Sequence, residues 1–124
     1  MTDAKELARA IKEGQDEIEI EYDLKKHVMR IKATGKVAWV VAFGAMTVVV
    51  ISTLAEIGSG GAATPVSALV ATPAVAGAVG VLGIDATTAA IIMAITARGV
   101  GVLKKLRKYD VEEISETKAI LYKK

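Results

Sequence analysis

The chain has no cysteine, few aromatic residues and almost no charge across its middle. The absence of cysteine excludes disulfide bonds and thiolate metal sites, and it leaves the redox compartment open. Aromatic residues make up 4% of the chain although hydrophobic residues make up 52%, so the apolar mass is mainly alanine, valine and isoleucine. Small and β-branched side chains pack closely but fill little volume, which suits helices that meet in lipid better than a globular core.

The lack of charge is concentrated in one segment. Between Lys36 and Lys104 the chain runs for 67 residues with three formal charges, Glu56, Asp85 and Arg98. A soluble chain of 124 residues is too small to bury such a stretch, so the sequence predicts a membrane protein. Its length allows one small polar domain beside the membrane part.

Three apolar runs divide this segment. The first, residues 37–57, has 21 residues, which at 1.5 Å per residue match a hydrocarbon core of about 30 Å. A flexible turn is expected at residues 58–61 (GSGG). Residues 62–84 contain two prolines and three glycines, so we expect a re-entrant or interfacial segment there rather than an unbroken helix. Asp85 is a good N-cap for a second span over residues 85–103.

The two polar ends predict a small α+β unit. Residues 3–13 have the apolar spacing of a short helix, and residues 17–22 alternate as a half-buried strand does. A second helix begins near Asp23 and could continue into the first apolar run; a strand over residues 27–33 is the alternative. The tail, residues 109–122, predicts a β-hairpin that the first strand could extend to three strands, with the first helix over one face.

The predicted fold is therefore an α-helical integral membrane protein with a cytoplasmic α+β cap. Residues 1–36 contribute a helix, a strand and a juxtamembrane helix to the cap. Residues 37–103 form the membrane region, with two transmembrane helices and the broken segment between them. Residues 104–124 contribute a basic juxtamembrane segment and the hairpin, which gives about three antiparallel strands in all.

Basic residues flank the membrane region on both sides and set the predicted topology. By the positive-inside rule both flanks face the cytoplasm, so the number of crossings is even. Three crossings, or a water-soluble form that inserts on activation, are the alternatives. The residues expected at lipid headgroups, including an aromatic belt, are Lys32, Lys36, Trp39, Lys104, Lys105, Arg107, Lys108 and Tyr109.

One helix face of the third run carries small residues only. They are Ala86, Ala90, Ala94, Ala97 and Gly101, at steps of four, four, three and four. Such a face lets helix backbones approach closely in lipid. We therefore expect a homo-oligomer that assembles through this face; packing between the two helices of one chain is the alternative.

The isolated charges are candidates for a pore or gate. Arg98 could snorkel to the headgroups or form a ring of arginines in a symmetric assembly. Glu56 and Asp85 would lie near the outer interface, where Asp85 fits a helix cap better than an ion ligand. His27 is the lone histidine, so no metal site is predicted, and neither a cofactor nor a catalytic motif is expected. Basic and acidic residues are too intermixed to predict nucleic-acid binding.

Residues 37–103 resemble, in composition, the hydrophobic hairpin of colicin-type pore formers. The resemblance implies membrane permeabilisation, although the amphipathic helical jacket of those toxins has no counterpart in this sequence. The predicted function is a small homo-oligomeric protein of the bacterial inner membrane that forms a pore or remodels the bilayer, with the cap controlling assembly. The alternative is a membrane-anchored scaffold or adaptor whose cytoplasmic cap binds a protein partner.

Overall fold

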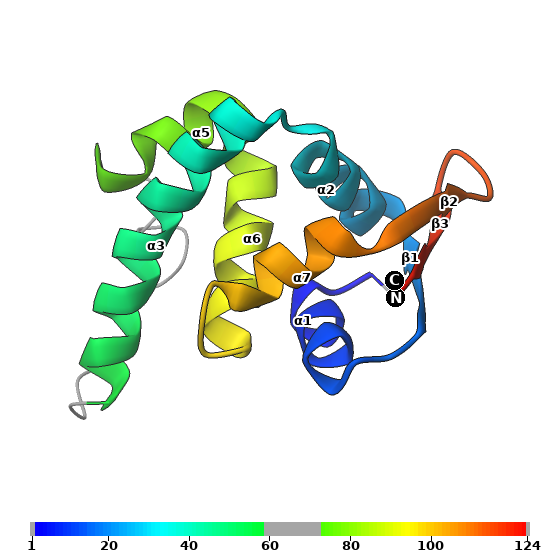
Figure 1. Ribbon diagram of the computed structural model, residues 1–124, viewed down its shortest axis with the longest axis horizontal. Coiled ribbons are helices and arrows are strands. Elements are labelled where there is room, and N and C mark those ends of the chain that lie inside the picture. The colour runs from blue at the N-terminus through cyan, green and yellow to red at the C-terminus, as the bar shows by residue number, and fades with distance from the viewer. Residues whose placement is uncertain (1, 59–72, 124) are drawn as a thin grey trace.

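The computed structural model describes residues 2–58 and 73–123, which form a mostly helical protein with a small antiparallel sheet (Figure 1). The predicted turn after residue 58 and the first half of the predicted 62–84 segment lie outside the described residues. The elements in chain order are α1 (Ala4–Glu13), β1 (Glu17–Glu21), α2 (Tyr22–Ala33), α3 (Lys36–Gly58), the 3-10 turn η1 (Pro73–Val75), α5 (Ala76–Leu82), α6 (Ile84–Thr96), α7 (Gly101–Lys108), β2 (Asp110–Glu113) and β3 (Lys118–Tyr122).

Helix α1 forms where the sequence predicts it, because a capping residue stands at each of its ends. The Asp3 carboxylate accepts a hydrogen bond from the backbone N–H of Lys5, at 2.9 Å, and caps the first turn. Gly14 ends the helix with a φ of 75°, a conformation that glycine adopts without strain. Leu7 and Ile11 lie on the apolar face and are buried.

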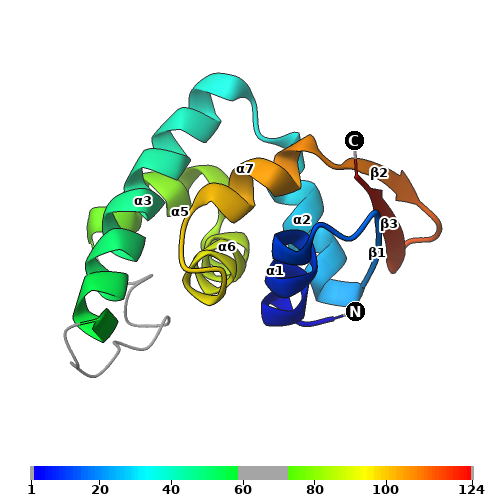
Figure 2. The same cartoon turned by 60° about the horizontal axis from the view of Figure 1, so that its bottom comes forward.

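The three-stranded sheet confirms the predicted hairpin and its extension by the first strand. The strand order is β1-β3-β2, and both pairings are antiparallel. Ile18 pairs with Leu121 and Ile20 with Ala119, and all four side chains are buried on the inner face. Because β1 precedes the apolar region and β3 follows it, both terminal segments lie at one end of the molecule, away from α3 (Figures 1 and 2).

The second polar segment is a helix, so the alternative strand over residues 27–33 is wrong. Helix α2 does not continue into the apolar run, because the chain leaves the helical conformation at Thr34 before α3 begins. Lys25 on α2 is buried, and its ammonium donates to the carbonyls of Ser115 and Glu116, at 2.7 and 3.0 Å. It also lies 3.6 Å from the Glu113 carboxylate, so it ties α2 to the β2–β3 turn.

The single helix predicted over residues 85–103 is wrong, because this segment forms two short helices, α6 and α7. Helix α6 begins one residue before Asp85, with Gly83 at its N-cap, and it ends at Thr96. Arg98 then adopts a φ of 59°, and the N–H of Gly99 closes the turn on the carbonyl of Ala94 at 2.8 Å. The chain reverses there, and α7 returns as an amphipathic helix that buries one apolar face, formed by Val102, Leu103 and Leu106.

Helix α6 lies at the centre of the unit that contains the sheet. It packs against α1, α2, α3, α5 and α7, and its buried residues are Ala86, Thr87, Ala89, Ala90, Ile91, Met93 and Ala94. With the sheet, α1, α2 and α7, it forms a core that includes Leu106 and Leu121 and continues into the buried residues of α3, η1 and α5. We call this unit the cap: α1, α2, α6, α7 and the three strands.

Helix α3 extends away from the cap, and η1 and α5 return beside it (Figure 1). A β-carbon at Gly77 in α5 would lie 3.3 Å from the Val41 side chain and 3.9 Å from the Ala45 β-carbon, so the two backbones approach closely. At Gly83, which has a φ of 83°, the chain bends by 116° between η1–α5 and α6. The helices α3, η1 and α5 are called the hairpin below.

Candidate membrane-contacting site

One face of α3 is packed and the opposite face is apolar and exposed. The packed face, against η1, α5 and α6, is formed by Ala42, Met46, Val49, Val50 and Thr53. The exposed large residues are Val37, Val40, Val48 and Ile51, whose exposed fractions run from 60% to 83%. Val41 is 53% exposed and lies at the edge of this strip, where its side chain faces Gly77 of α5. Isolated apolar residues at a surface are ordinary, but a strip of exposed apolar side chains from Val37 to Ile51 marks an interaction surface.

The exposure of α3 separates it from an ordinary core helix. Among residues 2–58 and 73–123, α3 is the one helix long and apolar enough to cross a membrane, over Lys36–Glu56. These 21 residues correspond to about 31 Å of helix. Only 28% of its most apolar stretch is buried within the chain, whereas a core helix of a soluble protein is mostly buried. Length and composition alone are weak evidence for a membrane span, so the exposed strip carries more weight.

A seam of aromatic and basic side chains joins the start of α3 to α7. The Trp39 and Phe43 rings lie 5.6 Å apart on one face of α3. The Arg107 guanidinium lies 4.5 Å from the centre of the Trp39 ring, and the Lys104 ammonium lies 5.2 Å from the centre of the Phe43 ring. These are cation–π distances. The seam therefore holds positive charge and amphipathic rings at the end of α3 that is nearest the cap.

Helices α2 and α7 also hold each other through their C-terminal carbonyls. The Lys32 ammonium donates to the carbonyl of Arg107 at 3.2 Å and to that of Tyr109. The Arg107 guanidinium donates to the carbonyl of Ile31 at 2.7 Å. Cations are favoured at helix C-termini, where the last carbonyls have no partner within the helix. Burial lowers the pKa of Arg107, as expected for a guanidinium held between two helices.

The residues predicted at lipid headgroups therefore fall into two groups. Lys36, Lys104, Lys105 and Lys108 are exposed. Lys32, Arg107 and Tyr109 form contacts inside the cap, and the Tyr109 hydroxyl donates to the carbonyl of Gln15 at 2.8 Å. Trp39 is half-buried in the seam. Sequence reasoning missed these contacts because the paired residues are 75 to 94 positions apart.

The small-residue face is divided between two helices. Ala86, Ala90 and Ala94 lie on α6 and are buried within the chain. Ala97 is half-buried in the turn after α6, and Gly101 is exposed at the start of α7. In this conformation the three buried methyl groups contact the chain's own helices, which is the alternative noted above. Assembly through this face stays a prediction, and it requires α6 to leave the cap.

The three candidate pore or gate residues are not brought together. Asp85 and Arg98 lie at opposite ends of α6 and are both exposed. Glu56 is exposed in the last turns of α3. Asp85 instead lines a polar groove with Asp23, His27 and Arg30 of α2. Within residues 2–58 and 73–123, no group of three histidine, cysteine or acidic side chains is placed to hold a metal ion.

Comparisons with protein-family models, curated proteins and solved structures find no match to this chain.

The contact between α2 and α7 should contribute measurably to the free energy of unfolding. Replacing Lys32 with methionine keeps the aliphatic stem but removes its hydrogen bonds to the C-terminal carbonyls of α7. Hydrogen bonds to a charged group contribute about 1.5–3 kcal/mol, so we expect the free energy of unfolding to fall by about that amount. Chemical denaturation followed by circular dichroism would measure it. Lys26→Met, at an exposed position of the same helix, should change the value by less than about 0.5 kcal/mol; equal losses in both variants would contradict the contact's importance.

Proposed function

We propose that the protein is a membrane-anchored adaptor, with the hairpin inserted in the bilayer and the folded cap in the cytoplasm beside it. The observation that carries the proposal is the exposed apolar strip on α3, which starts at Val37, directly after Lys36 and beside the aromatic and basic seam. Tryptophan and basic side chains favour the membrane–water interface, while apolar side chains favour the hydrocarbon. Lys36 and the seam therefore fit the membrane–water interface at the start of α3, and the exposed strip that continues to Ile51 fits the hydrocarbon.

The sheet supports an even number of crossings. Strand β1 precedes α3 and pairs with β3, which follows every apolar segment, so both must lie on one side of the bilayer. If α3 crosses, the chain has to return before Ile84, where α6 enters the cap. The return segment includes η1 and α5, which pack beside α3. We therefore propose that α3 and the return segment with η1 and α5 enter the bilayer, in place of the two spans expected over residues 37–57 and 85–103. Both termini are then cytoplasmic.

The outer face of the sheet is the surface that we propose for a protein partner. The register places Glu17, Glu19, Asp110 and Glu112 on one face with Ile120 and Tyr122, and the four acidic residues are exposed. Lys118 lies on the same face, where its ammonium is 3.0 Å from the Glu19 carboxylate, so the face carries one cation among its acids. A hydrogen bond to Glu112, together with burial, raises the pKa of Tyr122. An acidic surface around two half-buried apolar side chains fits a partner segment that is basic and carries an apolar residue.

A pore-forming or bilayer-remodelling homo-oligomer is the second candidate, and the combined apolar length of η1–α5 and α6 favours it. Taken together, η1–α5 and α6 are apolar and long enough for a second span, but they are bent by 116°. Straightening this bend would move α6 into the bilayer and expose Ala86, Ala90 and Ala94 for self-association. It would also remove the central helix of the cap, so this function requires a large conformational change.

Vesicles loaded with a self-quenching dye separate the two functions. We expect wild-type protein to float with vesicles of phosphatidylcholine and phosphatidylglycerol and to release no dye. Ala90→Cys supplies the single thiol of the chain at a buried site of α6, and it should form no disulfide-linked dimer in the vesicles. Dye release together with dimers through this thiol would favour the pore. A protein that fails to float would contradict both functions.

A further inference from the structure

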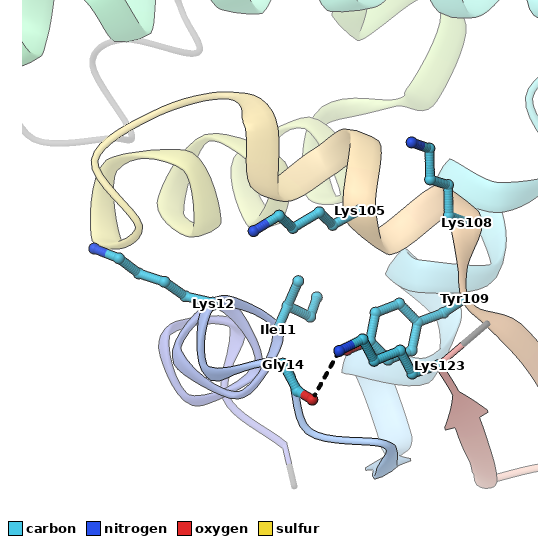
Figure 3. Close-up of a pocket in the computed structure, with 7 residues that line it drawn as sticks. All are labelled: Ile11, Lys12, Gly14, Lys105, Lys108, Tyr109 and Lys123. Atoms are coloured by element: carbon cyan, nitrogen blue, oxygen red, sulfur yellow. Dashed lines mark hydrogen bonds between the residues drawn. The ribbon is translucent and has the colours of Figure 1, made fainter.

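A cavity of about 240 Å³ lies between the end of α1, α7 and the segment after β3 (Figure 3). Its apolar wall is Ile11 and the ring of Tyr109, which are 1% and 5% exposed. Gly14 and four lysines complete the lining, namely Lys12, Lys105, Lys108 and Lys123. The cavity therefore combines a buried apolar wall with an exposed, strongly positive rim.

The lysines of this rim come from three separate segments of the chain. Lys12 is in the last turn of α1, Lys105 and Lys108 are in α7, and Lys123 follows β3. All four are exposed. Lys123 donates to the carbonyl of Gly14 at 3.4 Å, which holds its ammonium at the cavity (Figure 3).

The charge of the rim is not balanced from within. No acidic side chain lines the cavity among the described residues. Asp16 is the carboxylate whose field reaches Tyr109, where it adds to the effect of burial and raises the pKa of that phenol. The four ammonium groups of the lining leave a net positive site, and a bound anion would relieve the repulsion among them.

We propose that this lysine cavity binds a phosphate ester with a short apolar part. Lysine is a flexible point charge that commonly binds phosphate, and several lysines can contact one phosphate group. Ile11 and the Tyr109 ring would contact the carbon atoms next to the phosphate. The ester can belong to a free metabolite or to the headgroup of an anionic lipid. In the lipid case the inference rests on the proposed membrane insertion; in the other case it does not.

Two probes and two charge-matched variants of the full chain test this site. The probes are glycerol 3-phosphate, titrated into protein in an uncharged detergent, and vesicles of phosphatidylcholine with or without 20% phosphatidylglycerol. The site variant is Lys12→Gln with Lys105→Gln. The control variant is Lys5→Gln with Lys26→Gln, which removes two exposed lysines outside the cavity. Circular dichroism establishes that both variants remain folded, and Lys123→Gln provides a second, milder site variant.

We expect the site variant to lose roughly 30-fold in affinity for at least one probe, because each lysine near an anionic group contributes roughly fivefold. The control variant should change affinity less than twofold. Binding of glycerol 3-phosphate identifies a free ester as a ligand, and a gain that depends on phosphatidylglycerol and is lost in the site variant identifies a lipid headgroup. Equal losses in the two variants, or no binding of either probe by wild type, would overturn the proposal. The glycerol 3-phosphate measurement needs no bilayer, so its failure is distinct from failure to insert.

Discussion

Replacing Val48 and Ile51 with aspartate should abolish binding of the protein to vesicles. Both side chains are 60% exposed on the apolar strip of α3, so the substitutions leave the cap core intact. Aspartate near the centre of a membrane-spanning helix costs about 2.5–3.5 kcal/mol, so two of them should lower the affinity for vesicles by about 10³-fold or more. Flotation over a series of lipid concentrations would measure this loss.

Two controls separate insertion from general effects of charge. Val48→Leu with Ile51→Leu keeps the strip apolar and should bind vesicles as wild type does. Ile114→Asp adds an acid at a site on the cap that is 50% exposed, and it should change binding by less than threefold. If the double aspartate variant binds vesicles as tightly as wild type, α3 does not enter the hydrocarbon.

The second large effect concerns α6 as the core of the cap. Ile91→Ala should lower the free energy of unfolding by about 2–5 kcal/mol, since the side chain is fully buried and its removal leaves a cavity. The same change in a helix surrounded by lipid would leave the cap fold largely unaffected. Chemical denaturation in mild detergent, followed by circular dichroism of the cap, would measure the difference.

The neighbouring residue provides the matched control. Ile92 has the same side chain on the same helix but is half-buried. Ile92→Ala should therefore cost clearly less than Ile91→Ala, because its surroundings can collapse or be filled by solvent. Equal costs for the two variants would contradict the assignment of α6 to the cap core.

The sequence predicted α1, β1 and the β2–β3 hairpin because local signals fix these elements. Asp3 and Gly14 mark the two ends of α1, and the alternation around Ile18 and Ile20 marks a strand with one buried face. The β2–β3 hairpin and its pairing with β1 follow from the same alternation in the tail, residues 109–122. These signals act over a few residues, so they do not depend on how the rest of the chain packs.

The sequence did not predict the fate of residues 85–103, because hydropathy does not distinguish a buried core helix from a span. Helix α6 is apolar on nearly every face because it is a buried core helix that other helices surround. The turn did leave a signal: Gly99 and Gly101 follow Arg98, and the next residues are amphipathic. The buried contacts of Lys25 and Lys32 link positions far apart in the chain, and no local pattern indicates them.

Labelling of single cysteines with a membrane-impermeant maleimide tests the central claim most directly, because the chain has no cysteine of its own. Val48→Cys places the thiol on the exposed strip of α3, and Ile114→Cys places it on the exposed surface of the cap. In detergent-free vesicles we predict that the thiol at position 48 is protected and that the thiol at position 114 reacts as fast as in the unbound protein. Equal reactivity of both thiols with and without vesicles would contradict the insertion of α3.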